Sequence, residues 1–162
     1  MSLSISNGMN KKIKVKKLGI ILAPTETKFE NRSVLNPAVY QEGDYVHVFY
    51  RAIDKRLNSS IGYGKLKGPT EVIERLDKPI IERQYIYEKK GLEDPRIVKI
   101  GGTFYMTYVA HDGKNALFAY ATSHNLKDWK RRGLISPKIK YDTAGKIFTK
   151  GKLKDRYFMF ES

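Results

Sequence analysis

The sequence contains no cysteine, a single tryptophan and three histidines among its 162 residues. The absence of cysteine excludes disulfide bridges, thiolate nucleophiles and cysteine-ligated zinc. The three histidines, His47, His111 and His124, are not spaced as metal ligands are, so we expect no metal site. No apolar run is long enough to cross a bilayer and the N-terminus has no signal-peptide core. We therefore expect a soluble, cytoplasmic protein with no membrane partner.

Acidic residues are also scarce, since 17 Asp and Glu stand against 31 Lys and Arg and give a formal charge of +14. Such a surface favours anionic partners such as phosphate, sugar phosphates or nucleic acid. Nucleic acid ranks last because the lysines are dispersed and no nucleic-acid-binding module is recognisable. No phosphate-binding loop or dinucleotide fingerprint is recognisable, and no cofactor is expected. No Ser-His-Asp arrangement is recognisable either.

The residues that are abundant favour β-structure. The chain is 41% hydrophobic and 12% aromatic, with thirteen glycines and frequent Val, Ile and Thr, which is typical of many short strands joined by tight turns. We expect one all-β domain over residues 1–162, with residues 1–10 as a flexible start. Residues 11–19, where apolar side chains alternate with lysines, predict a strand with an exposed lysine face.

The sequence repeats itself at a spacing of 58 residues. Residues 36–54 (NPAVYQEGDYVHVFYRAID) align without a gap with residues 94–112 (DPRIVKIGGTFYMTYVAHD), and each segment reads as strand, turn and strand. A third strand follows in each unit, at 59–67 and 116–123, and residues 125–133 add a turn and an outer strand. Each unit is thus predicted to be a small antiparallel sheet.

A third unit opens at residues 141–148, and residues 155–162 supply its second strand. Repeats of about 50 residues, each a small sheet, are the signature of a β-propeller. A β-sandwich also fits the periodicity. The prediction is a partial propeller of about two and a half blades, with units near 36–90, 94–140 and an incomplete 141–162.

Polar residues stand at equivalent positions of the first two units. In a propeller the innermost strand of every blade lines the central channel, so residues that open equivalent strands converge on one pocket. Asn36 and Asp94 are such a pair, each followed by a proline that fixes the backbone where the strand starts. Arg51 and Asp54 lie where the first hairpin returns.

The stretch GLEDPRI, residues 91–97, sets Glu93 and Asp94 beside Arg96. Cleavage of a glycosidic bond with inversion needs a carboxylic acid that protonates the leaving oxygen, and either carboxyl is a candidate. A neighbouring carboxyl helps an acid to keep its proton, whereas the arginine opposes this. Phosphate as nucleophile needs cationic groups and no protein base. The competing interpretation is a structural turn with an Asp cap and a surface ion pair.

Several motifs together resemble a known family. In order over residues 36–133 they are NPAV, YRA, SSIGYG, YEKKGLEDPRI, GGTFYMTYVA and ATSHNLKDWKRRG, and they resemble glycoside hydrolase family 130. The resemblance implies a five-bladed β-propeller that acts on β-mannosides. Most members are inverting phosphorylases that yield α-mannose 1-phosphate, and some are hydrolases.

The resemblance also implies roles for individual residues. Asp94 matches the family's general acid, which passes its proton to the glycosidic oxygen through the 3-hydroxyl of the sugar. Asn36, Arg51 and Arg96 would contact the mannosyl unit or shape its pocket. Glu93 and Asp54 are further candidates for substrate binding.

The chain departs from the family pattern in two ways. The family's third repeat reads Phe-Pro-Glu and ends its hairpin in a His-Arg pair whose arginine helps to hold phosphate, but here the stretches are IFTKG and MFES. Lys146 matches a family lysine and is the candidate phosphate ligand. Family members are also about twice as long, so the open sheet edges predict further blades or a second copy of the chain as partner.

Three functions follow from these observations. The first is a carbohydrate-active enzyme that breaks β-mannosidic bonds in oligosaccharides, with inorganic phosphate or water as nucleophile and no cofactor. The second is a non-catalytic sugar-binding module or scaffold. The third, binding of nucleic acid through charge, predicts affinity that falls steeply with salt.

Overall fold

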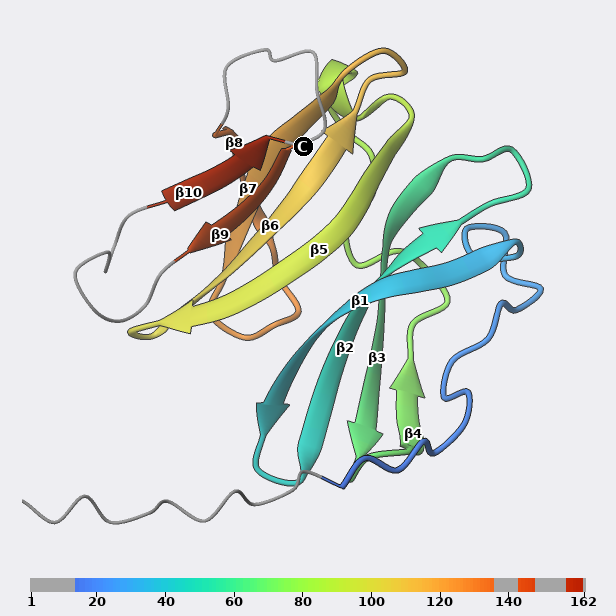
Figure 1. Cartoon of the computed structure of the whole chain (residues 1–162). Coiled ribbons are helices and arrows are strands. Elements are labelled where there is room, and N and C mark those ends of the chain that lie inside the picture. The colour runs from blue at the N-terminus through green and yellow to red at the C-terminus, as the bar shows by residue number, and fades with distance from the viewer. Residues whose placement is uncertain (1–13, 136–142, 148–156, 162) are drawn as a thin grey trace, which may run out of the picture.

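The computed structural model describes residues 14–135 and, by their backbone, the strands at 143–147 and 157–161. Two twisted four-stranded sheets lie side by side, with strands β1 and β5 next to each other (Figure 1). The described residues contain no α-helix, and their one short helical turn is the 3₁₀ turn η1 (Ile86–Glu88). The described residues form no helix with the length and apolar character needed to cross a membrane.

Each sheet is a meander of consecutive antiparallel strands. The first sheet contains β1 (Ser33–Glu42), β2 (Tyr45–Ile53), β3 (Ser59–Lys67) and β4 (Glu71–Arg75). The second contains β5 (Gly91–Ile100), β6 (Thr103–His111), β7 (Ala116–Ser123) and β8 (Lys130–Leu134). A hairpin of β9 (Thr143–Ile147) and β10 (Tyr157–Glu161) follows. The prediction of repeated small antiparallel sheets is confirmed.

Both inner strands carry the same β-bulge. In β1, Asn36 and the proline after it stand opposite the single residue Tyr50. In β5, Asp94 and its proline stand opposite Tyr108 in the same way. Proline has no backbone N–H, so a bulge is a place inside a sheet where it disturbs no ladder hydrogen bond. The 58-residue repeat therefore includes the β-bulge as well as the strands.

Two expectations about strands were wrong. The inner strands begin at Ser33 and Gly91, three residues before Asn36 and Asp94, because the ladder continues on both sides of each bulge. The lysine-rich segment forms no strand over residues 14–19, where no described strand pairs with it; residues 11–13 lie outside the described part.

The main core lies between the two sheets. Alternation along a strand sends Phe49 of β2 towards the second sheet and its neighbours Val48 and Tyr50 to the opposite face. The ring of Phe49 meets Trp129 edge to face at 5.6 Å, so this tryptophan packs as a core residue. The buried residues of this core are Ala38, Phe49, Ile61, Tyr63, Ile81, Leu92, Phe104, Met106, Tyr108, Ala110, Ala119, Ala121 and Leu126. Packing of the two sheets against each other fixes how β1 faces β5.

A buried carboxylate anchors the segment that precedes each sheet. In the first, Glu30 accepts hydrogen bonds from the Tyr50 hydroxyl at 2.7 Å and pairs with Arg75 at 3.0 Å. Arg75 also donates to the Ala23 carbonyl at 2.8 Å and so ties the outer strand β4 to this segment. Burial, with the hydrogen bond to Glu30, raises the pKa of Tyr50.

The second sheet repeats this arrangement with Glu88, which is completely buried. Its carboxylate accepts a hydrogen bond from the Tyr108 hydroxyl at 2.8 Å and pairs with Arg131 of β8. Arg131 also donates to the Glu82 carbonyl. Glu88 and Tyr108 each lie 58 residues after their counterparts in the first sheet, so the anchor belongs to the repeat.

We expect the substitution Glu88→Gln to lower the free energy of unfolding by about 3–5 kcal/mol, because it leaves the Arg131 guanidinium without its buried counter-charge. The matched control is Glu74→Gln, which removes a half-exposed ion pair with Lys127 and should cost less than about 1 kcal/mol. Urea denaturation followed by tyrosine and tryptophan fluorescence measures both. Equal losses for the two variants would contradict the account.

Candidate active site

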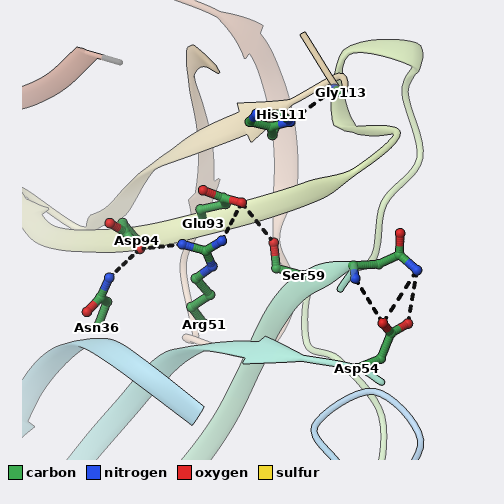
Figure 2. Close-up of polar contacts among 9 residues, drawn as sticks. Asn36, Arg51, Asp54, Ser59, Glu93, Asp94, His111 and Gly113 are labelled. Atoms are coloured by element: carbon green, nitrogen blue, oxygen red, sulfur yellow. Dashed lines mark hydrogen bonds and ion pairs between the residues drawn. The ribbon is translucent and has the colours of Figure 1, made fainter. Parts of the chain in front are cut away.

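Four of the residues selected from the sequence meet where the two sheets face each other (Figure 2). The side-chain amide of Asn36 donates a hydrogen bond to Oδ1 of Asp94 at 2.7 Å. One nitrogen of the Arg51 guanidinium donates to Oε1 of Glu93 at 2.6 Å, and the other lies 3.6 Å from Oδ1 of Asp94. Asn36 and Arg51 come from the first sheet, and the two acids from the second. The site is thus built between the blades.

The bulges explain why Asn36 and Asp94 point towards each other. Both residues have positive φ, 47° and 48°, in the left-handed region that Asn and Asp tolerate better than most residues. This conformation turns each side chain out of the regular alternation of its strand. Asn36 is exposed and the Asp94 side chain is 36% exposed, so a ligand can reach both. Strained positions of this kind gather at functional sites.

Ser59 belongs to this cluster, although the sequence reasoning did not select it. Its hydroxyl donates to Oε1 of Glu93 at 3.3 Å, and its N–H donates to the carbonyl of Lys90 at 3.2 Å. A Cβ on Gly91 would lie 2.0 Å from the Ser59 hydroxyl, so only glycine permits this close approach. The motif SSIGYG and the glycine of GLEDPRI were the available signals, but their contact depends on how the sheets pack.

The two acids differ in their surroundings. Oε1 of Glu93 accepts from both Arg51 and Ser59, so the Glu93 carboxylate holds the arginine in place. Oδ1 of Asp94 faces Asn36 and Arg51, while its Oδ2 accepts no hydrogen bond from the described residues. Asp94 therefore offers one carboxylate oxygen to a ligand. Of the two candidate acids, it is the better placed.

Asp54 lies apart from the cluster and holds the β2–β3 loop. Its carboxylate accepts the backbone N–H groups of Arg56 and Asn58, each at 2.8 Å, and the Asn58 side-chain amide. Burial raises the pKa of Asp54, but these hydrogen bonds outweigh it and the net shift is downward. Asp112 caps a loop that is one residue shorter in the second sheet, and its hydrogen bonds with Asn115 lower the pKa of Asp112 to about 2.

Two further predicted residues are not part of the cluster. Arg96 is exposed, and its guanidinium donates to the carbonyl of Pro95 at 2.9 Å. Lys146 falls in β9, whose side chains lie outside the described part of the structure. Among the residues that the structure describes, no three His, Cys, Asp or Glu side chains gather as metal ligands would.

The fold agrees with the comparison to known families. The sequence model of glycoside hydrolase family 130, described as beta-1,4-mannooligosaccharide phosphorylase, matches residues 9–162. The chain belongs to glycoside hydrolase family 130. Solved structures of this family are five-bladed β-propellers, and the present chain covers part of such a propeller.

Two curated relatives come from a Thermoanaerobacter species. A 1,2-beta-oligomannan phosphorylase is 32% identical over 160 residues, covering 91% of this chain and 53% of the relative. A beta-1,2-mannobiose phosphorylase is 33% identical over 157 residues, covering 86% and 51%. A glycosyl hydrolase structure from Bacteroides ovatus superposes with a TM-score of 0.73 at 26% identity, covering 87% of this chain and 50% of that one. The chain spans about half the length of the curated relatives it matches.

The left-handed backbone at Asn36 predicts an unusual order of stability. We expect Asn36→Gly to be more stable than Asn36→Ala by about 1 kcal/mol, because alanine is strained at φ 47° and glycine is not. At the exposed β1 position Val39 the order should reverse, with alanine better than glycine by roughly 0.5–1 kcal/mol. Urea denaturation of the four variants checks this, and the same order at both positions would disprove the strain.

Proposed function

We propose that this protein breaks β-mannosidic bonds by inverting phosphorolysis and releases α-mannose 1-phosphate, with Asp94 as general acid. The observation that carries the proposal is the Asp94 carboxylate itself, held at a bulge between the blades by Asn36 and Arg51 and presenting Oδ2 to a ligand. It lies in the GLEDPRI stretch of a family 130 chain. The two curated relatives are named as phosphorylases of β-1,2-mannosides.

The proposed reaction uses the site as follows. A phosphate oxygen attacks the anomeric carbon from the face opposite the leaving group, and the bond from that carbon to the glycosidic oxygen breaks. The electron pair stays on the glycosidic oxygen. Asp94 gives its proton to the 3-hydroxyl of the mannosyl unit, and this hydroxyl gives its own proton to the glycosidic oxygen. Asp94 is then an anion, and the Asn36 amide at 2.7 Å and the Arg51 guanidinium are in place to stabilise it. No cofactor takes part.

The neighbouring residues have supporting roles in this proposal. Asn36 and Arg51 bind or shape the mannosyl pocket, and Glu93 keeps Arg51 oriented through its 2.6 Å hydrogen bond. Lys146 is the proposed phosphate ligand. Arg96 and Asp54 stay candidates for contacts further from the reacting bond, since neither touches the Asp94 cluster in the described structure.

The proposed substrates are β-1,2-mannooligosaccharides, because both curated relatives are named for that linkage. The family description instead names β-1,4-mannooligosaccharides, so both linkages belong in the assay. The charge of +14 supports phosphate as co-substrate, since it raises the local concentration of anions.

Incubation with β-1,2-mannobiose and with β-1,4-mannobiose, each with and without phosphate, tests the proposal. We expect α-mannose 1-phosphate to form from the β-1,2-linked disaccharide only when phosphate is present. Asp94→Asn should lower the rate by about 10²–10⁴-fold, the usual contribution of a general acid. The control Asp44→Asn, at an exposed position of the β1–β2 turn, should leave the rate unchanged.

Other results have defined meanings. Free mannose in both tubes would show a hydrolase, and full activity of Asp94→Asn would refute the role of Asp94. A second function, sugar binding without turnover, is favoured by one observation: the sequence reads MFES where the family pattern has the arginine that helps to hold phosphate. Saturable binding of mannobiose without any product would establish that function instead.

A further inference from the structure

A cavity of about 660 Å³ opens between the β2–β3 loop and the segment that leads from β4 into β5. Its wall combines aromatic, cationic and carboxylate side chains. They include Phe29, Asp54, Asn58, Arg83, Tyr85 and Lys89.

The cavity adjoins the Asp94 site through two chain segments. Asn58 lines the cavity, and the next residue, Ser59, donates its hydroxyl hydrogen bond to Glu93. Lys89 also lines the cavity, and the carbonyl of Lys90 accepts the N–H of Ser59. In Figure 2, Ser59 lies between Asp54 and Glu93.

The separation suits an oligosaccharide. Five residues join Lys89 to Asp94, which is at most about 17 Å of extended chain. A sugar chain whose terminal unit lies at Asp94 can therefore reach the cavity, and no residue of the Asp94 cluster lines the cavity.

The segment that forms one wall is held rigidly. The buried Glu88 carboxylate accepts the N–H groups of Gln84 at 2.9 Å and Tyr85 at 3.2 Å. The Arg83 guanidinium donates to the carbonyl of Lys89 at 2.8 Å and closes the loop. The wall is thus shaped before any ligand binds, which lowers the entropic cost of binding.

The wall presents an aromatic ring to the solvent. The Tyr85 side chain is 40% exposed, and its ring stacks on Tyr87 with centroids 5.1 Å apart and planes 12° apart. The position 58 residues earlier is Thr27, so the repeat itself does not require an aromatic residue there. A fixed ring beside hydrogen-bonding side chains is the combination that binds a sugar, with the C–H face on the ring and hydroxyls on the polar groups.

We propose that this cavity binds the leaving-group end of a β-mannooligosaccharide, with the Tyr85 ring as its platform, and so gives the protein a preference for longer chains. This inference rests on the proposed function. Because mannose 1-phosphate derives from the terminal unit alone, every further unit of the substrate lies on the leaving-group side. Tyr85 is then a specificity residue that takes no part in the chemical step.

Isothermal titration without phosphate tests the cavity independently of turnover. We expect Tyr85→Ala to weaken binding of β-1,2-mannotetraose by about three- to tenfold, the usual worth of one aromatic contact, and to leave β-1,2-mannobiose unchanged. The control is Tyr45→Ala. This tyrosine is also 40% exposed, and it begins β2, at the end of the strand away from the β2–β3 loop and the cavity. It should change neither affinity, and circular dichroism verifies that both variants are folded.

The outcomes separate this inference from the proposed reaction. Selective weakening of mannotetraose in Tyr85→Ala supports the cavity even where no phosphorolysis is observed. If the wild type carries out phosphorolysis but Tyr85→Ala binds both sugars as tightly as the wild type, the role of the cavity is refuted and the proposed reaction stands. Equal weakening for both sugars would also overturn it, because a length-selective site must discriminate between them.

Discussion

The guanidinium of Arg51 is the interaction on which the site depends. Arg51 lies on β2 of the first sheet. Its guanidinium is 2.6 Å from the Glu93 carboxylate and 3.6 Å from the Asp94 carboxylate, and both acids lie on β5 of the second sheet. Each of the two acids has a second contact from the first sheet, Ser59 for one and Asn36 for the other. Because the partners belong to different sheets, the site exists only when the sheets are packed in this relative position. Packing of the two sheets and assembly of the candidate site therefore share one set of contacts.

Comparison of the two repeated sheets distinguishes residues that stabilise the fold from residues that differ between the sheets. Both sheets contain the same bulge and the same buried carboxylate held by a tyrosine and an arginine, which indicates that these parts serve the architecture. Among the many sequence differences between the sheets are residues of the site and of the cavity. Equivalent bulge positions carry Asn36 in one sheet and Asp94 in the other, and equivalent segments carry Thr27 and Tyr85. The same bulged strand geometry thus presents different side chains in the two sheets.

The sequence predicted the parts of this molecule that follow from periodicity. The 58-residue repeat predicted both sheets and the approach of Asn36 to Asp94, because equivalent inner strands line one channel. It did not predict Ser59, whose contact depends on how closely Gly91 packs, and the lysine-rich N-terminal segment was wrongly expected to be a strand. Glu30 and Glu88 obey the same spacing, but a glutamate in a loop gives no sign that it is buried. Periodicity therefore locates strands, whereas side-chain partners depend on packing between sheets.

The proposed function requires the space beside Asp94, between the two sheets, to receive the terminal mannosyl unit. A crystal structure of the protein soaked with β-1,2-mannobiose shows whether it does. We expect a mannosyl ring with a hydroxyl within about 2.6–3.2 Å of Oδ2 of Asp94, while the Asn36 and Arg51 contacts to Oδ1 are retained. A sugar bound elsewhere while Asp94 stays unliganded would contradict the account.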